Sequence, residues 1–284
     1  MEFPRSPSGN NNTIPVTNST SGTRPFATLV GNLSNPHPYY NSSYGYVSPN
    51  LWDFTKGGGG TVMNLYNNSS IHLSTDLYNA GNGVGIFGYP SVHFTYNLPL
   101  SLNEIYKGNF SSFVSFSIKQ VSQQVRYDVA YDMFLGKNST PQYEVEIMLV
   151  DDLSGEVYSG QNATFSGVSV VIPIQINNDT EKVTWDLYIG NSASGVFPSY
   201  VFVPLINTSD SMSFKLAFTP FLSYLEDRSY LSSNVSILRV GIGSEFAASS
   251  LPHQSIALMY SFWIFSYFIL DNVKYQVVQP EGVV

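Results

Sequence analysis

The 284-residue chain contains no cysteine, and only 11% of its residues are charged. The absence of cysteine excludes disulfide bonds and thiolate metal sites. An ordinary soluble domain has about 25% charged residues, so this protein must build its polar surface from Asn, Ser, Thr and Tyr instead. Its 12 basic and 20 acidic residues give a net charge of −8, and basic clusters are nearly absent. We therefore expect no binding to nucleic acid or to anionic membranes.

The low charge also bears on where the protein works. Fewer native ion pairs leave fewer carboxylates whose protonation would cost stability as the pH falls, so the composition suits an acidic medium. Asn-x-Ser/Thr triplets recur along the chain, for example at Asn32, Asn138 and Asn234, and this triplet is the glycosylation pattern of secreted proteins. Together these features predict a secreted, extracellular protein.

Signals for metal binding and for membrane insertion are weak. The histidines are scattered without metal-ligand spacing, at His37, His72, His93 and His253, so we predict no metal, no other cofactor and no role for these side chains. The apolar run 256–270 has 15 residues, fewer than the roughly 20 that a membrane-spanning helix needs. Its aromatic content predicts one or two core strands and no membrane contact.

The distribution of residue types predicts one folded domain. Residues 1–25 contain mostly polar residues and Pro, which predicts a disordered Ser/Thr/Asn-rich linker or tail. From residue 26 to 284, short alternating runs such as 143–150 and 168–176 are separated by Gly, Asn, Ser and Pro. Many short strands with frequent turns are typical of an all-β antiparallel sandwich or barrel. We therefore place the domain at 26–284.

One segment departs from the alternation of a strand. Residues 219–231 place Thr219 as an N-cap and Pro220 at the first helical position, and the apolar residues that follow keep helical spacing. This segment predicts a single short helix that packs on the convex side of a sheet.

Carboxylates gather on one face of a predicted hairpin, because alternate side chains of a strand point to opposite faces. The polar faces carry Arg126, Asp128, Ala130, Asp132 and Phe134 on one strand, and Glu144, Glu146, Met148 and Val150 on the next. Folding the chain about Gly136, Asn138 and Pro141 brings Asp132 close to Glu146. Like charges so placed are costly unless they share protons or serve a function.

A third strand, 234–246, adds a further carboxylate to this face. Arg239, Gly241, Gly243 and Glu245 lie on its polar side, and the two glycines predict an open floor beside Glu245 with room for a ligand. A single carboxylate here would be an ordinary solvated charge, but the whole set is unusual in a chain with so little charge.

Two carboxylates that face each other over an open sheet suit glycoside hydrolysis. One protonates the leaving oxygen, and the other attacks the anomeric carbon or activates water. Flat aromatic rings cover the C–H groups of sugars, and Trp52, Tyr89 and Trp185 are candidates for this contact; the alternative for each is packing in the core.

Short motifs in chain order extend this inference. They are PNLWDF (49–54), GYPSV (88–92), VAYDMFL (129–135), EIMLV (146–150), WDLYIG (185–190), YVFV (200–203), FLSYLEDRSY (221–230) and GSEF (243–246). In this order they resemble the glycoside hydrolase family 12 endoglucanases, β-1,4-glucanases that retain anomeric configuration. The resemblance implies a concanavalin-like jelly roll of two antiparallel sheets, a β-glucan polysaccharide substrate and no cofactor. We expect a monomer.

The resemblance also implies roles for individual residues. Glu146 would be the nucleophile, Glu245 the general acid/base, and Asp132 the carboxylate that hydrogen-bonds the nucleophile. Trp52 and Met148 would line sugar subsites. Val150 stands where the family usually has Trp, which alters one cleft wall.

Two points on the chemistry stay open at this stage. The stretch YEVE at 143–146 can be aligned one strand period earlier, which makes Glu144 a rival nucleophile and otherwise a substrate-binding candidate beside Tyr89. A retaining double displacement further requires the two catalytic carboxyls to lie about 5–5.5 Å apart.

Two other functions compete with an endo-1,4-β-glucanase. A carbohydrate-binding, lectin-like sandwich without catalysis would share the architecture, since a fold does not fix a function. It would need aromatics and amides rather than two carboxylates in attack geometry. A structural surface protein, favoured by the Asn, Ser and Thr content, predicts no open cleft.

Overall fold

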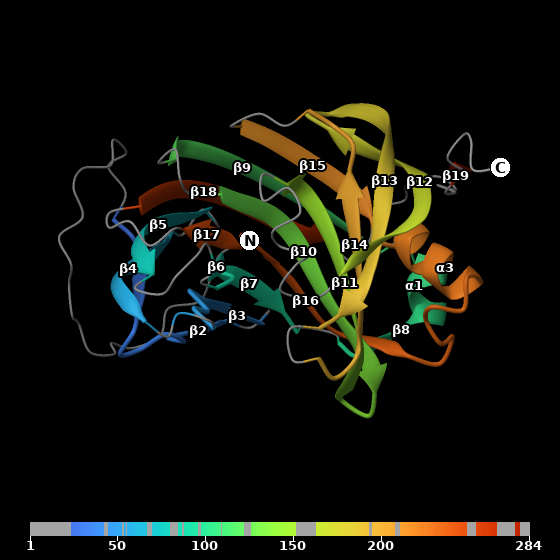
Figure 1. The fold of residues 1–284 in the computed structure, drawn as a ribbon, viewed down its shortest axis with the longest axis horizontal. Coiled ribbons are helices and arrows are strands. Elements are labelled where there is room, and N and C mark those ends of the chain that lie inside the picture. Colours follow the sequence, from blue (N-terminus) through green and yellow to red (C-terminus); the bar gives the residue numbers. More distant parts are fainter. Residues whose placement is uncertain are drawn as a thin grey trace.

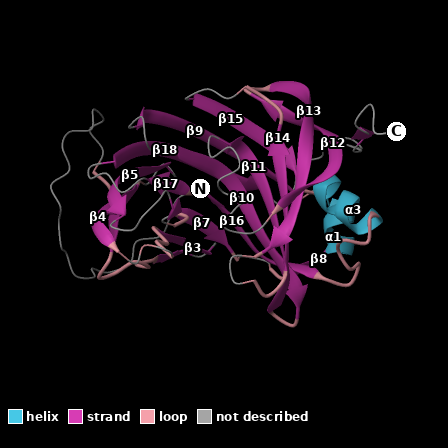
Figure 2. Ribbon diagram, in the orientation of Figure 1, coloured by secondary structure: helices cyan, strands magenta, loops and turns pink. Residues whose placement is uncertain are grey.

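Two β-sheets packed face to face make up most of the protein in its computed structural model (Figure 1, Figure 2). The structure describes residues 24–42, 45–52, 54, 56–66, 70–79, 85–86, 88–95, 98–108, 110–121, 126–151, 163–192, 195–207, 211–248, 254–265 and 276–278. The predicted tail, 1–25, lies almost wholly outside these residues, so its boundary stays a prediction.

Backbone pairing gives the order of the strands in each sheet. The six-stranded sheet runs β1 (Ala27–Asn32), β4 (Gly57–Leu65), β5 (Ser70–Asn79), β18 (Gln254–Phe265), β9 (Ser111–Val121) and β15 (Ser211–Ala217). The nine-stranded sheet runs β12 (Thr164–Ile176), β13 (Asp179–Asn191), β14 (Pro198–Pro204), β11 (Thr140–Asp151), β10 (Arg126–Lys137), β16 (Ser236–Gly243), β7 (Ser91–Phe94), β3 (Gly45–Ser48) and β2 (Tyr40–Ser42). The remaining short strands are β6 (Gly85–Ile86), β8 (Leu100–Ser101), β17 (Phe246–Ala248) and β19 (Gln276–Val278). The end of β12 also pairs with β15 and so joins the two sheets.

Two hairpins that turn on asparagine build the centre of the nine-stranded sheet. β10 and β11 are joined by Asn138 and Ser139, with φ of 50° and 63°, and β12 and β13 by Asn177 and Asn178, with φ of 50° and 75°. Tight hairpin turns need positive φ at both central residues, which Asn tolerates better than most residues. The second hairpin carries the chain from β11 to its parallel neighbour β14; among the described strands this is the one parallel pair, and such a pair needs a long crossover connection.

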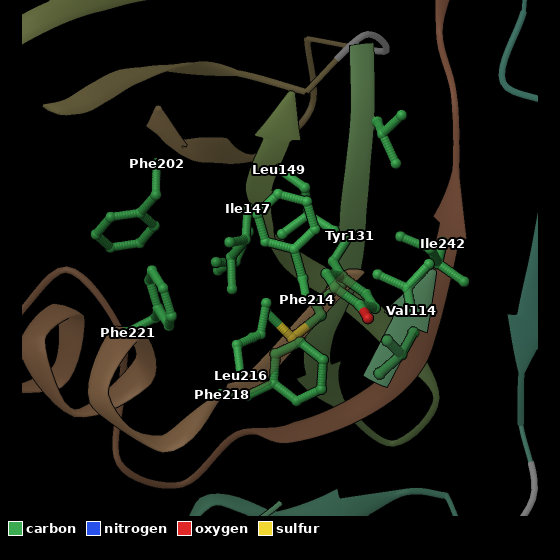
Figure 3. Close-up of a cluster of buried hydrophobic side chains, with 14 of the residues drawn as sticks. Val114, Tyr131, Ile147, Leu149, Phe202, Phe214, Leu216, Phe218, Phe221 and Ile242 are labelled. Carbon is green, nitrogen blue, oxygen red and sulfur yellow. The ribbon is translucent and has the colours of Figure 1, made fainter. Parts of the chain in front are cut away.

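Alternation along the strands separates the core from the opposite face of the nine-stranded sheet. On β11, Val145, Ile147 and Leu149 are fully buried in the hydrophobic core between the sheets. Figure 3 shows Ile147 and Leu149 in this core, close to Tyr131 of β10. The Tyr131 hydroxyl is 2.5 Å from Ser112 Oγ, so its buried polar group is hydrogen-bonded. Each such large apolar side chain contributes about 1.5–3 kcal/mol on burial.

The predicted helix is α3 (Thr219–Asp227), and it packs on the core side of the sheet. Phe221 meets the rings of Phe202 and Trp185 edge-on at 5.0 Å each, and Figure 3 shows Phe221 directed at Phe202. The predicted N-cap was wrong: Phe218 caps the helix without a side-chain hydrogen bond, and Thr219 is already helical. Pro220 lies in the first turn, one position after the first helical residue, where it was predicted.

A second helix, α1 (Leu102–Gly108), was not predicted and lies beside α3 (Figure 1). Its start is a capping box. The Ser101 backbone N–H donates to Glu104 Oε2 at 2.9 Å, while the Glu104 N–H donates to Ser101 Oγ at 3.3 Å. The pattern Ser-x-x-Glu at 101–104 was therefore a readable signal for this helix.

The apolar run near the end of the chain is a strand, as predicted. β18 pairs with β5 on one side and β9 on the other, while 266–270, the rest of the run, lie outside the described residues. Within the described part of the chain, no helix is long and apolar enough to cross a membrane.

Candidate functional site

Strand register places four of the predicted polar residues in two adjacent rows across the nine-stranded sheet. Asp132 of β10 lies directly opposite Glu146 of β11, as the hairpin predicted. One step further along, Phe134 lies opposite Glu144 on one side and Arg239 of β16 on the other. Directly opposite residues point to the same face, so these side chains share the face that is turned away from the core.

A cavity of about 240 Å³ lies over these rows. Carboxylates, a few nitrogen-containing side chains and aromatic rings line it: Asp128, Asp132, Glu144, Glu146, Glu245, Arg239, His93, Asn50, Tyr46, Tyr89, Trp52, Phe134 and Ala130. Five of the chain's 20 acidic residues thus share one small cavity. Such a concentration is costly to maintain, which marks the cavity as the candidate site.

Glu245 reaches the cavity from a break between two strands. β16 ends at Gly243 and β17 begins at Phe246, so Glu245 lies outside both. Its backbone N–H donates to Asp128 Oδ1 at 2.7 Å, and its carbonyl accepts from the Asp128 N–H at 3.0 Å. The Ser244 hydroxyl donates to the Asp128 carbonyl. Asp128, to which sequence reasoning gave no role, is fully buried and holds this segment in place.

Burial and, after it, the crowding of carboxyl groups raise the pKa values of Asp132, Glu144 and Glu245. Burial, followed by the charge of Glu146, raises the pKa of Asp132 above its usual range. The pKa of Glu144 rises through burial and then through Asp132 and Glu146. Glu245 shows the same direction, with burial the main cause and Asp128 the next. The cavity therefore holds protonated carboxyls at pH values at which exposed ones are ionised.

Arg239 is the cation of the cavity, and sequence reasoning gave it no role although it placed Arg239 on the polar face. Its guanidinium carbon lies 4.1 Å from the centre of the Phe134 ring, a cation–π contact. Its Nη1 donates to the Tyr46 hydroxyl at 3.2 Å. The positive charge partly offsets the rise in the pKa values of Asp132 and Glu144.

His93, for which the sequence predicted no role, lines the cavity. Its ring stacks on Tyr46 at 4.5 Å, and its Nε2 lies 2.7 Å from Ser91 Oγ. Because the Ser91 hydroxyl donates to the Tyr89 carbonyl at 2.8 Å, its oxygen accepts a hydrogen bond from the His93 Nε2–H, and Nδ1 is left as an acceptor. Burial and, after it, the charge of Arg239 lower the pKa of His93 to about 3, so the ring is neutral above that pH.

The predicted open floor at the two glycines is wrong. A Cβ on Gly241 would lie 2.9 Å from His93 Nδ1, and one on Gly243 would lie 2.4 Å from the Pro90 carbonyl oxygen. Strand β7 and the turn before it already fill this space. The glycines therefore permit close packing of β7 against β16 and do not leave room for a ligand.

The close contact at Gly241 gives a testable prediction. We expect Gly241→Ala to push the His93 ring away, costing about 1–3 kcal/mol of stability as overpacking does and lowering any activity of the site. Gly108→Ala is the matched control, because a Cβ there meets nothing within 4 Å. Thermal unfolding of both variants checks this, and equal melting temperatures would contradict it.

The structure brings two of the predicted aromatic residues to the cavity. Trp52 is 40% exposed at its edge. Tyr89 is buried in its wall, where its hydroxyl donates to the Ala130 carbonyl at 2.8 Å and its N–H to the Asn50 carbonyl at 2.9 Å. The motifs at 49–54 and 88–92 thus meet at one place. Burial, and next the charge of Asp132, raises the pKa of Tyr89, which keeps its hydroxyl proton.

Three other predicted positions lie elsewhere. Trp185 is fully buried in the core. Met148 has no exposed surface either; it packs in a small apolar cluster with Ala130 and Val201 and does not line the cavity. A bulge in the pairing of β10 with β11 turns Val150 into the main core, so Val150 does not form the altered cleft wall expected from the sequence.

No metal site is visible at these carboxylates. Among the described residues, no group of three or more His, Cys, Asp or Glu side chains is arranged to hold a metal ion. Carboxyl groups and aromatic rings make up much of the lining of the cavity.

Comparison with known proteins identifies the family. The model of glycosyl hydrolase family 12 matches residues 43–261, most of the chain. The chain belongs to glycosyl hydrolase family 12. The family match covers Trp52, Tyr89, Asp132, Glu146 and Glu245, and family membership makes this protein a glycoside hydrolase. No curated protein matches the sequence.

Solved structures of family 12 proteins share the fold. Endoglucanase 3 of Trichoderma harzianum superposes with a TM-score of 0.59 at 23% identity, over 84% of this chain and 98% of that one. A xyloglucanase of Bacillus licheniformis gives 0.57 at 19% identity, over 89% and 99%. The catalytic domain of Humicola grisea Cel12A gives 0.59 at 20% identity, over 89% and 99%. The predicted all-β jelly-roll sandwich is thus confirmed.

Proposed function

We propose that this family 12 chain is a secreted endo-β-1,4-glucanase that hydrolyses cellulose or a related β-glucan with retention of configuration. The observation that carries the proposal is that Glu146 of β11 and Glu245, from the segment between β16 and β17, line the same cavity. The names of the structural relatives support a β-glucan substrate, since they include an endoglucanase and a xyloglucanase. The recurring Asn-x-Ser/Thr triplets and the low charge support secretion.

The proposed reaction is a double displacement in which two carboxyls exchange roles. Glu146 attacks the anomeric carbon, and the Glu245 carboxylic acid gives its proton to the leaving glycosidic oxygen. Water then attacks the glycosyl-enzyme ester while Glu245 takes the proton from that water, which restores both groups. The raised pKa of Glu245, caused first by burial and then by Asp128, supplies the acid form that the first step needs.

Register and protonation favour Glu146 over Glu144 as the nucleophile. Glu146 lies directly opposite Asp132, whose protonated carboxyl can donate a hydrogen bond to Glu146 and so favour the ionised form of the nucleophile. Glu144 lies opposite Ser199, and the Ser199 side chain hydrogen-bonds the Glu144 carboxyl. Burial, and then the charge of Asp132, raises the pKa of Glu144. A carboxyl that keeps its proton is a poor nucleophile, so we assign Glu144 to substrate contact.

Unpartnered polar atoms in the cavity also favour a polyhydroxylated ligand. Asp132 Oδ1, Glu144 Oε2, Glu245 Oε2, Arg239 Nε and His93 Nδ1 are buried without a hydrogen-bond partner among the described residues. Such atoms are rare in folded proteins and call for an explanation. Both donors and acceptors occur among them, which matches sugar hydroxyl groups, since these can donate and accept. Trp52, exposed at the edge of the cavity, offers its ring to a sugar face.

Reducing-sugar release from barley β-glucan and carboxymethyl cellulose, measured from pH 2 to pH 7, tests the function. We expect hydrolysis of both, with the uncharged β-glucan cleaved faster, because the five carboxylates of the cavity repel an anionic polymer once they ionise. The preference should grow as the pH rises. Binding of glucan without any release would refute the enzyme assignment and leave a carbohydrate-binding sandwich.

A further inference from the structure

We propose that Arg239 and Glu144 form a second polar contact row of the cleft, which hydrogen-bonds hydroxyl groups of the glucan away from the reacting bond. This inference rests on the proposed function, since it assumes that a β-glucan occupies the cavity. It assigns Arg239, a residue outside the family resemblance, to substrate binding and specificity rather than to the chemistry.

The two side chains belong to one row of the sheet. Phe134 of β10 lies directly between Glu144 of β11 and Arg239 of β16. The next row along the strands holds Asp132 and Glu146. Along β16, residue numbers rise from Arg239 towards Glu245, so the row of Arg239 lies on the side of Glu146 that is away from the proposed acid/base.

The guanidinium covers Phe134, and this decides what the row can bind. With its central carbon 4.1 Å from the ring centre, Arg239 covers one face of the Phe134 ring, and that face is not available for stacking on a sugar. Recognition at this row is therefore polar: the ligand must present hydroxyl groups to an arginine and a carboxyl, and an apolar sugar face gains nothing there.

Each side chain keeps a buried polar atom that such a ligand can reach. Arg239 uses Nη1 for the Tyr46 hydroxyl, but its Nε has no hydrogen-bond partner among the described residues. Glu144 is 6% exposed, receives a hydrogen bond from Ser199, and keeps Oε2 without a partner. Both side chains line the cavity. A buried polar atom without a partner costs free energy that a ligand hydroxyl recovers on binding.

The alternative is that Arg239 serves the fold alone, by stacking on Phe134 and by its hydrogen bond to Tyr46. That role predicts loss of thermal stability without loss of ligand affinity. The two roles are separated by measuring binding in a variant that does not turn over the substrate, so that chemistry does not enter the result.

The experiment is calorimetric titration of Glu146→Gln with cellotetraose, alone and combined with Arg239→Met or Glu144→Met. We expect each added substitution to raise the Kd about tenfold, as the loss of a hydrogen bond with a charged or buried partner does. Glu144→Gln should bind within about threefold of the parent, because an amide still offers a donor and an acceptor. Arg239→Lys should bind as weakly as Arg239→Met, since lysine keeps the charge but has no Nε–H at that position.

Two variants outside the cavity serve as matched controls. Arg228→Met removes an arginine that lies over the Tyr224 ring at 5.6 Å near α3, and Glu181→Gln changes an exposed glutamate of β13. Both should leave the Kd unchanged.

Unchanged affinity in Arg239→Met and Glu144→Met, with the wild type hydrolysing β-glucan, would overturn this inference and leave the proposed function intact. A wild type that neither binds nor cleaves any glucan would instead refute the proposed function. Melting temperatures of all variants separate a loss of folded protein from a loss of affinity.

Discussion

Glu146→Gln is expected to lower kcat/KM for barley β-glucan by about 1,000-fold or more, the scale seen when an enzyme loses its nucleophile. Glu144→Gln is the matched control, because it makes the same chemical change two residues away on the same face of β11. We expect it to retain activity within about tenfold, since an amide preserves the contacts of a protonated carboxyl. Reducing-sugar assays at saturating and limiting substrate measure both.

A second measurement makes this prediction specific to the nucleophile. In Glu146→Ala, azide can occupy the space of the missing carboxylate and attack the same face of the anomeric carbon. We expect rescue with an activated aryl cellobioside to give the α-glycosyl azide, in which the configuration is inverted relative to the β-linked substrate. If azide instead rescues Glu144→Ala, then Glu144 is the nucleophile and not Glu146. If both variants keep their activity, neither residue takes part in the chemistry.

Thermal stability is expected to fall as the pH rises from about 5 to 8, by about 5 °C or more, opposite to the usual effect of native carboxylates. Asp132, Glu144 and Glu245 all have folded-state pKa values raised first by burial. Between the pKa of a carboxyl in the unfolded chain and its higher pKa in the folded protein, the native state binds more protons than the unfolded chain. The free energy of unfolding therefore decreases as the pH rises across that range. Each 1 kcal/mol shifts the melting temperature of a domain of this size by about 2–4 °C.

Glu144→Gln isolates one contribution to this effect. The glutamine amide is neutral at every pH, so the melting temperature of the variant should lie about 3 °C above that of the wild type at pH 8. At pH 5, where Glu144 of the wild type keeps its proton, the two melting temperatures should be equal. Glu181→Gln, on the exposed end of β13, should not change the slope. A wild type that gains stability steadily up to pH 8 would show that the carboxyls are ionised in the fold and would contradict this account.

Side-chain alternation was sufficient to predict much of the site. Asp132, Glu144 and Glu146 lie on one face because β10 and β11 are regular there, and a tight turn at Asn138 fixes their register. Regularity fails at the ends of this region. A bulge turns Val150 into the core, and Glu245 lies between two strands, so its position depends on Asp128 rather than on a pleat.

The missed residues were those whose role depends on contacts between distant segments. Arg239 and Tyr46 are 193 positions apart in the chain and hydrogen-bond in the fold. His93 enters the cavity because β7 pairs with β16, with His93 directly opposite Gly241. A single sequence gives no signal for such pairs. The signal for α1 is different, because its capping box at 101–104 is local and can be read from the sequence alone.

The place of β18 has a consequence for how the chain folds. Its partners β5 and β9 come from much earlier in the sequence, and β18 hydrogen-bonds with both along its length. Until residues 254–265 are synthesised and in place, β5 and β9 each keep an unpaired edge, the kind of surface on which chains aggregate. We infer that the six-stranded sheet closes late in folding, so a chain that stops before β18 should accumulate in insoluble form. The interior position of β18 in the sheet therefore makes the last stage of folding the most exposed to aggregation.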